Sequence, residues 1–303
     1  MRWRRALWIA LADAISGGGG AQAQPAALPP PRHLRANGTE IQYVDQGAGA
    51  PVVFVHGAFS DLRYWEPQRE AIAARHRFVA FTLRHHGVNP RRDDGQPYSA
   101  AVHAADLVAF IRELGLGRVH LVGLSYGGLV ALLVASEHPD LVQSLTLAEP
   151  GASSLLADTP EGKRLVAERL RSFEPIRAAV QAGDTARATK MFVEWADNRR
   201  AGDFAREPEA VRTMALDNAR TLPLLLAAPP PPPISCATLR GMRVPTLVIG
   251  GERTRRFYSA INEVVARCLP GSRLTTIPTA THLTSHHSPA VFNDAILRFI
   301  DEQ

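Results

Sequence analysis

The chain has 303 residues, of which 46% are hydrophobic and 21% are charged. This composition argues against an intrinsically disordered protein, because the chain carries enough apolar surface to bury a core. The formal net charge of +5 comes from 34 basic and 29 acidic residues, and the basic residues are scattered rather than gathered. A nucleic-acid partner is therefore not expected, since it needs basic side chains collected on one face.

Residues 1–23 resemble a secretory signal peptide. Three arginines precede a short apolar run over residues 6–15, and residues 21–23, Ala-Gln-Ala, have the small-x-small form of a cleavage site. The apolar run is too short for a stable membrane anchor. Asp13 and four glycines depart from the pattern, so a disordered extension is the alternative. We expect a periplasmic or secreted protein, or a cytoplasmic one if the leader is not cleaved.

A proline-rich leader is predicted over residues 24–38, and strands and helices alternate after it. Short β-branched runs predict strands, and amphipathic runs predict helices. In chain order these are strand 41–45, strand 51–57, helix 62–74, strand 77–83, helix 99–114 and strand 118–123. Buried strands that alternate with helices predict an α/β fold, with a mostly parallel sheet covered on both faces.

The alternation of strands and helices stops over residues 152–240, where helical patterns occur without a convincing strand. We expect a helical cap inserted into a core made of residues 39–151 and 241–303. Five prolines at 229–233 predict a stiff extended return from the cap to the core. The alternation then resumes with strand 244–251, helix 258–266, strand 273–278 and helix 289–300. Whether Cys236 and Cys268 form a disulfide stays open, although an oxidising compartment would allow it.

The most specific motif is Gly123-Leu124-Ser125-Tyr126-Gly127, which lies between a buried strand and a helix. This placement is typical of a nucleophile elbow, in which glycines flank a cramped turn that presents a reactive serine. The helix that begins there favours developing negative charge. An idle serine in a glycine-rich turn is the alternative.

The chain apart from its leader and cap resembles the α/β-hydrolase family. The stretch FVHGAF, residues 54–59, is similar to the His-Gly oxyanion loop of the family. The stretch FTLRHHGVNP, residues 81–90, stands where members often carry an Arg-Gly-His-Gly-like sequence. The stretch IPTATHL, residues 277–283, is similar to the late strand and loop that deliver the catalytic histidine. The resemblance implies a serine hydrolase with Ser125 as the nucleophile.

A serine hydroxyl needs a positioned imidazole to accept its proton. His282 holds the position that matches the family, and His286 and His287 are nearby alternatives that we expect to be surface residues. The two oxyanion donors are predicted to be the backbone N–H groups of Tyr126 and Ala58, with Phe59 as the alternative to Ala58.

Two histidine features outside this set are expected to be structural. His56 is predicted to brace the oxyanion loop. The adjacent His85 and His86 are predicted to pack a loop rather than to bind metal, because they lack spaced cysteine or acidic partners. No metal and no cofactor are expected.

The catalytic acid is absent from its usual place. Many family members carry an aspartate after the strand that corresponds to residues 246–251, and this chain has Thr254 there. Haloalkane dehalogenases and zearalenone-type lactonases instead carry the acid after the strand that follows the nucleophile helix. Glu149 ends that strand here, so it is predicted to be the acid, and Glu252 is the alternative. The dehalogenase resemblance stops there, since those enzymes need an aspartate nucleophile.

These observations predict a serine hydrolase that acts on an ester or lactone of a small hydrophobic molecule. The lactone preference comes only from the zearalenone-type resemblance, and the hydrophobic preference comes from apolar side chains of the cap. A perhydrolase or haloperoxidase-like enzyme and a carbon-carbon bond hydrolase would use the same residues. A ligand-binding protein without catalysis is the alternative from another class. The sequence does not indicate the oligomeric state.

Overall fold

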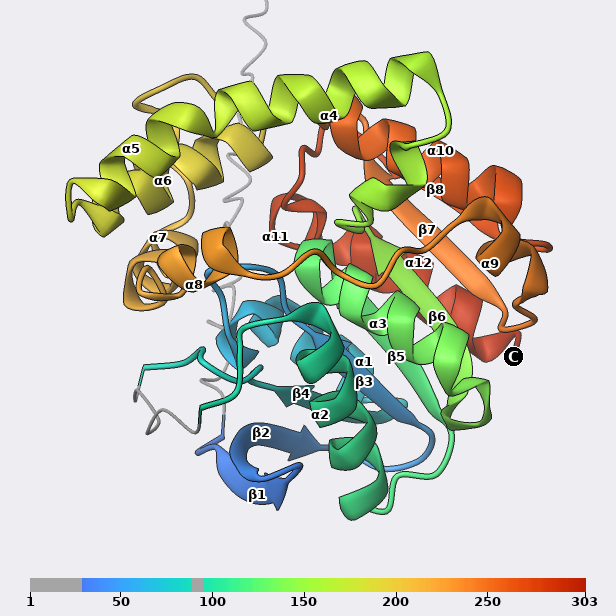
Figure 1. Ribbon diagram of the computed structural model, residues 1–303. Coiled ribbons are helices and arrows are strands. Elements are labelled where there is room, and N and C mark those ends of the chain that lie inside the picture. The colour runs from blue at the N-terminus through green and yellow to red at the C-terminus, as the bar shows by residue number, and fades with distance from the viewer. Residues whose placement is uncertain (1–28, 89–94) are drawn as a thin grey trace, which may run out of the picture.

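The computed structural model describes residues 29–88 and 95–303, so the predicted signal peptide over residues 1–23 lies outside it. The described part forms an α/β fold in which one mixed, mostly parallel sheet carries helices on both faces (Figure 1). Within it, no helix combines the length and the apolar character that a membrane crossing requires. The predicted fold class is confirmed.

Eight strands make up the sheet in the described residues, in the order β1-β2-β4-β3-β5-β6-β7-β8. Every pairing from β4 to β8 is parallel, and β1 and β2 are antiparallel at one edge. The strands are β1 Arg32–Ala36, β2 Thr39–Gln46, β3 Pro51–Val55, β4 Arg77–Phe81, β5 Val119–Leu124, β6 Val142–Ala148, β7 Thr246–Gly251 and β8 Arg273–Ile277.

The predicted boundary of the proline-rich leader is wrong at its C-terminal end. Residues 32–36 form β1, which pairs with β2 through the register Ala36↔Thr39. Asn37 and Gly38 form the turn, with φ values of 47° and 73°. An Asn-Gly pair suits a two-residue hairpin because both positions need positive φ. This local signal places the start of the folded core before residue 39.

Helices cover the two faces of the sheet and enclose two hydrophobic clusters. In Figure 1, α2 and α3 lie in front of the sheet, and α1 and α12 lie behind it. The front cluster includes Leu107 and Val130, and the rear cluster includes Ile72 and Phe292. The core helices are α1 Glu66–Ala73, α2 Ala100–Glu113, α3 Ser125–Glu137, α10 Arg256–Cys268, α11 Thr284–His287 and α12 Pro289–Asp301.

Between β6 and β7 the chain forms helices that lie over one end of the sheet (Figure 1). The regular helices of this cap are α4 Pro160–Ser172, α5 Glu174–Gln181, α6 Thr185–Ala196, α7 Glu209–Asp217 and α8 Thr221–Ala227, and α9 Cys236–Gly241 follows the cap and packs against α10. Aromatic rings join the cap to the core, since the Trp195 ring of α6 packs 4.9 Å from Phe173 within the cap and 5.7 Å from Phe257 of α10, measured between ring centroids. The cap is therefore packed onto α10.

The segment that leaves the cap is pinned at its end. Residues 229–233 have no helix or strand, and the next residue, Ile234, exchanges two hydrogen bonds with the Ser154 hydroxyl, at 2.9 and 3.1 Å. A disulfide then joins Cys236, at the start of α9, to Cys268, at the end of α10. The pairing that the sequence left open is thus present, and it ties α9, which follows the cap, to α10.

This disulfide closes a loop with a sequence separation of 32 residues. A crosslink across such a loop restricts the unfolded chain, so the double variant Cys236→Ser/Cys268→Ser is expected to lose about 2–4 kcal/mol of unfolding free energy. Urea unfolding at pH 7.5 measures the loss. A reducing agent should lower the wild type by a similar amount and leave the double variant unchanged. Equal stability of the two oxidised proteins would contradict the crosslink.

Candidate active site

Ser125 occupies a strained turn between β5 and α3. Its φ is 52°, a value that side-chain-bearing residues rarely adopt. The turn is possible because the flanking glycines leave room. A Cβ on Gly127 would lie 2.3 Å from the carbonyl oxygen of His56, and a Cβ on Gly123 would lie 2.5 Å from that of Gly127. The motif therefore forms the geometry of a nucleophile elbow, with the serine projecting from the turn.

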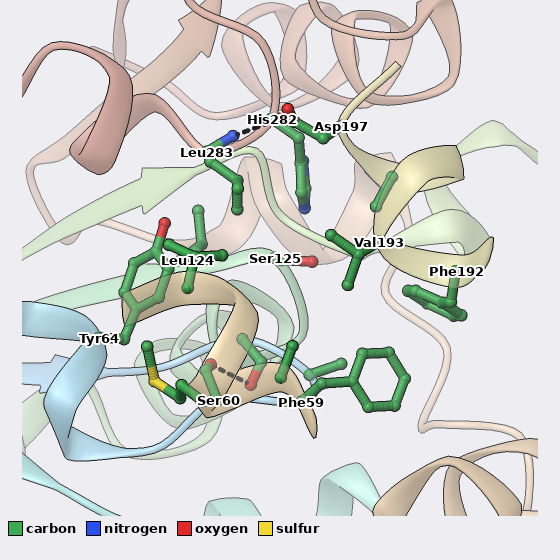
Figure 2. Close-up of a pocket in the computed structure, with 16 residues that line it drawn as sticks. Phe59, Ser60, Tyr64, Leu124, Ser125, Phe192, Val193, Asp197, His282 and Leu283 are labelled. Carbon is green, nitrogen blue, oxygen red and sulfur yellow. Dashed lines mark hydrogen bonds between the residues drawn. The ribbon is translucent and has the colours of Figure 1, made fainter. Parts of the chain in front are cut away.

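His282 faces this serine from the loop after β8. Figure 2 shows its imidazole ring directed toward the Ser125 hydroxyl, and both residues line one cavity. The ring of Tyr258, from α10, stacks on the imidazole with a centroid distance of 4.0 Å. Burial raises the pKa of Tyr258, so the phenol stays protonated at neutral pH. The stacking fixes the plane of the imidazole.

Glu149 approaches the other side of His282. It follows β6 with a φ of 52°, and its side chain is fully buried. Its Oε2 atom lies 3.4 Å from Nδ1 of His282. The acid–histidine contact predicted for Glu149 is therefore present, and Ser125, His282 and Glu149 come together from β5, β8 and β6.

Three donors other than His282 satisfy the Glu149 carboxylate. Oε1 accepts hydrogen bonds from the Gly251 backbone N–H at 2.9 Å and from the Asn262 amide at 3.0 Å. Oε2 accepts one from the Thr254 hydroxyl. Thr254 is the residue that stands where an aspartate was expected. This position thus donates a hydrogen bond to the glutamate on the neighbouring strand.

Glu252, the alternative acid, lies elsewhere. Its side chain is exposed, and its Oε2 accepts a hydrogen bond from the Thr279 backbone N–H at 2.7 Å. Thr279 has a φ of 59°, so this bond holds a strained residue in the loop that leads to His282. Glu252 supports the loop, and in the described part of the chain it forms no hydrogen bond or ion pair with His282.

The alternative histidines are also engaged elsewhere, and neither is the surface residue that the sequence predicted. His286 donates from Nε2 to the Tyr64 carbonyl at 2.8 Å, and burial lowers its pKa to about 4. Nδ1 of His287 lies 3.0 Å from the Thr281 hydroxyl. Both side chains are partly buried because the short helix α11 packs against the core.

The predicted oxyanion donors border Ser125. Ala58 and Tyr126 both line the cavity at the serine, and a Cβ on Gly57 would lie 3.4 Å from the Ser125 Cβ. Tyr126 stands in the first turn of α3, where backbone N–H groups have no partner within the helix. The two loops therefore approach the serine closely enough to direct N–H groups at a carbonyl oxygen.

His56 braces this loop, as its sequence context predicted. Its Nδ1 donates to the Gly57 carbonyl at 2.8 Å, and its Nε2 accepts from the Leu83 backbone N–H at 3.0 Å. Since a backbone N–H can only donate, the imidazole is neutral with its proton on Nδ1. Burial lowers its pKa to about 4, which keeps it in that form at neutral pH.

His86 is a packing residue as well. Its Nδ1 lies 2.9 Å from the Ser60 carbonyl, and its Nε2 lies 3.1 Å from the Tyr98 hydroxyl. Burial lowers its pKa well below the usual value. His103 lies in the same layer, 2.8 Å from the Tyr126 hydroxyl, and burial lowers its pKa to about 3. These buried histidines support the oxyanion loop, and their partners are oxygen atoms of the protein.

Among the described residues, Asp197, Glu207 and His287 form the one group that is spaced closely enough for a metal ion. Arg199 already occupies the centre of it, because its Nε lies 2.9 Å from Asp197 and 2.8 Å from Glu207. A guanidinium there neutralises the carboxylates in place of a cation, so the group does not fit a metal.

Asp197 has a structural task beside the site. Its Oδ1 accepts hydrogen bonds from the Thr281 hydroxyl and from the Leu283 backbone N–H, the latter at 3.1 Å (Figure 2). These two residues flank His282 in the sequence, so a buried carboxylate of the cap holds the histidine loop from both sides. This role could not be predicted from the sequence, because it depends on how the cap docks onto the core.

Tyr258 and Asn262 were also missed from the sequence. They are four residues apart on α10, so they share one helix face, and both are buried. A buried asparagine needs hydrogen-bond partners. Asn262 stands out in the sequence as a polar residue on the apolar face of α10. The sequence does not indicate that its hydrogen-bond partner is Glu149.

Ser125 lies between two cavities. The inner cavity measures about 50 Å³ and has mostly apolar walls, which include Tyr64, Leu124, Phe192 and Met214. The middle cavity, about 70 Å³, is also lined by Ser125 and has Tyr126, Phe257 and Tyr258 among its other walls. The site can therefore hold one part of a small molecule on each side of the nucleophile.

Comparisons with known proteins agree with this arrangement. The sequence pattern of the alpha/beta hydrolase family matches residues 52–295. The chain is 27% identical to the 2-(acetamidomethylene)succinate hydrolase of Mesorhizobium japonicum, over 85% of this chain and 90% of that protein. The solved structure of Est816, described as an N-acyl homoserine lactone degrading enzyme, is 26% identical with a TM-score of 0.70, over 88% of this chain and 100% of that one.

A second solved structure is similarly close. A thermophilic esterase from Thermogutta terrifontis, solved with malate bound, is 26% identical with a TM-score of 0.71. The match covers 90% of this chain and 99% of that one. These similarities extend through the core and the cap alike.

The acid is tested by exchanging each glutamate for its amide. Glu149→Gln is expected to lower kcat/KM for an activated ester by about a thousandfold or more, because His282 loses its counter-charge and its fixed tautomer. Glu252→Gln, the matched control, is expected to stay near the wild type. Circular dichroism should first confirm that both variants fold. The reverse order of losses would assign the acid to Glu252.

The buried histidines predict acid sensitivity. Burial lowers the pKa of five of them, to about 4 for His56, His120 and His286, to about 3 for His103 and well below the usual value for His86. Between pH 6.5 and about 4 the unfolded chain binds protons that the native state does not. The free energy of unfolding therefore falls as the pH falls through this window.

Burial raises the pKa of Asp197, so protonation of this carboxyl group favours the native state as the pH falls. This single group opposes the combined effect of the five histidines. Urea unfolding at pH 7.5, 6.0 and 5.0 measures the slope. His286→Gln keeps a donor for the Tyr64 carbonyl and should reduce the slope. Unchanged stability between pH 7 and 5 would show that these histidines are not held neutral.

Proposed function

From the premise that the chain belongs to the alpha/beta hydrolase family, we propose that it is a serine hydrolase that cleaves carboxylic ester or lactone bonds through an acyl-enzyme. One observation carries this proposal. The Glu149 carboxylate contacts Nδ1 of an imidazole whose ring faces a serine on a strained elbow. This chain of acid, imidazole and hydroxyl is what a serine needs to act as a nucleophile.

The reaction begins with attack of the Ser125 Oγ on the carbonyl carbon, while Nε2 of His282 takes the hydroxyl proton. Glu149 holds the proton on Nδ1 and stabilises the imidazolium. The backbone N–H groups of Ala58 and Tyr126 receive the oxyanion of the tetrahedral intermediate. The intermediate collapses, the alcohol leaves with the proton from His282, and the acyl group stays on Ser125. Water, activated by His282, then releases the acid and restores the serine.

The choice of ester and lactone bonds is supported by the similar proteins. Est816 is described as degrading N-acyl homoserine lactones, and the Thermogutta terrifontis protein is an esterase. The inner cavity suits an apolar portion of such a substrate, because Leu124, Phe192 and Met214 line it. An ester or lactone of a small molecule fits the space on the two sides of the serine.

The proposal is tested with 4-nitrophenyl acetate and a fluorophosphonate probe. The wild type should hydrolyse the ester and become labelled on Ser125, as located by peptide mass spectrometry. Ser125→Ala should lose about a thousandfold or more of the activity and all of the labelling. Thermal unfolding should first show that this variant is folded.

Two outcomes would overturn the proposal. A wild type that is neither active nor labelled would indicate a ligand-binding protein without catalysis. Activity that persists in Ser125→Ala would place the nucleophile elsewhere.

A further inference from the structure

Arg169 of the cap lies beside the nucleophile. It projects from α4 and lines the middle cavity together with Ser125 and Tyr258. Its guanidinium carbon lies 4.4 Å from the ring centroid of Phe173 and 5.6 Å from that of Phe257. Aromatic faces on this scale hold a guanidinium by cation–π attraction. The charge is thereby fixed in position next to the site.

This arginine lacks an acidic partner. Among residues 29–88 and 95–303, no carboxylate forms an ion pair with Arg169, and no side chain or backbone group hydrogen bonds to its guanidinium. Burial lowers its pKa, and the positive charge of Arg177 lowers it further. Arg84, which is buried in the core, is by contrast neutralised by Asp106 at 2.7 Å. A desolvated cation without a counter-charge is costly unless a ligand supplies one.

Arg177 adds a second positive charge to the same space. It lies on α5 and lines, with Arg169, a larger hollow beneath the cap, which we call the cap cavity, of about 570 Å³. Its Nη1 atom is buried and has no hydrogen-bond partner among the described residues. Two guanidinium groups thus line one cavity, and in the described part of the chain the Nη1 atom of Arg177 has a hydrogen-bond donor without an acceptor.

The walls of this space contain nothing that would neutralise the two charges. The residues that line the middle and cap cavities include no aspartate and no glutamate. The two cavities share Tyr126, Gly151, Arg169 and Leu225, so they adjoin beside Ser125. The cap cavity, at about 570 Å³, is in the size range of small-molecule sites. An anionic group there would meet two cations and no repelling charge.

We propose that the substrate is an ester or lactone that also bears a carboxylate, which Arg169 binds with the help of Arg177. A guanidinium presents donors in a planar fork that matches the two oxygens of a carboxylate. The inference rests on the proposed hydrolase function and narrows its substrate class. The apolar part of the substrate occupies the inner cavity, and the carboxylate lies on the opposite side of Ser125.

The test uses two pairs of esters in which a carboxylate is replaced by a neutral amide of the same shape. The pair 4-nitrophenyl adipate monoester and 4-nitrophenyl adipamate carries the change in the acyl half. The pair 4-acetoxybenzoate and 4-acetoxybenzamide carries it in the leaving half. For each pair the ratio of kcat/KM, charged over neutral, is measured in the wild type and in variants, so that intrinsic reactivity cancels.

Arg169→Gln is expected to lower the ratio about 10- to 100-fold in at least one pair, because a charge-assisted hydrogen-bonded contact is lost. Arg177→Gln should lower the ratio of the same pair by a smaller factor. Arg169→Lys should lie between the wild type and Arg169→Gln, since it keeps the charge and loses the fork. If Arg169→Gln fails to fold, the other two variants carry the test.

Arg164→Gln is the matched control, since Arg164 lies on the same helix, is exposed and pairs with Glu168. It should leave both ratios unchanged. Ratios that stay within twofold of the wild type in both pairs for every Arg169 and Arg177 variant would overturn the proposal. So would an equal fall with Arg164→Gln, because the effect would then be one of overall charge.

Calorimetry of adipate binding distinguishes failure of the hydrolase function from failure of the carboxylate site. If the wild type hydrolyses none of the four esters, the function proposed above fails, and adipate binding then decides the anion site by itself. Adipate should bind the wild type at least about tenfold more tightly than it binds Arg169→Gln, and neutral adipamide should not distinguish the two proteins. Equal adipate affinity in both would overturn the site.

Discussion

The carboxylate of Glu149 is fully buried, and the geometry around the serine depends on how its two oxygens are satisfied. Removing an ion of this size from water costs several kcal/mol unless hydrogen bonds and opposite charge compensate. Here Gly251, Asn262 and Thr254 supply the donors, and His282 supplies the group that becomes positive in the reaction. The site is therefore stable only when β6, β7, α10 and the histidine loop are assembled together.

The sheet explains why an acid at the end of β6 can serve a histidine that follows β8. Parallel strands end at one edge, and neighbouring strands lie about 4.8 Å apart. Glu149 is joined to β7 by its own backbone N–H, which donates to the Ile249 carbonyl at 3.0 Å. An acid on either strand thus reaches the same imidazole nitrogen, and the longer glutamate side chain spans the extra strand. Thr254 occupies the position after β7 where many family members carry the acid, and its hydroxyl donates a hydrogen bond to Glu149.

Features that depend on local sequence could be predicted, whereas contacts between distant segments could not. The elbow at Ser125 needs its glycines whatever surrounds it, and the resemblance to the α/β-hydrolase family indicated the positions of His282 and Glu149 at the ends of their strands. The disulfide and the donor role of Asn262 depend on where α10 packs. The Asn37-Gly38 pair favours a hairpin, but the prolines that precede it led to the prediction of an unstructured leader up to residue 38.

The cap contributes to the site in two ways that a core alone would lack. Asp197 holds the residues on both sides of His282, and Arg169 places a cation beside the serine. A cap that moved away as a rigid body would break the hydrogen bonds from Thr281 and Leu283 and would leave the histidine loop without its anchor. Entry of the substrate through the cavities that adjoin Ser125 keeps these hydrogen bonds, whereas lifting the cap breaks them. The cap and the core therefore form one structural unit.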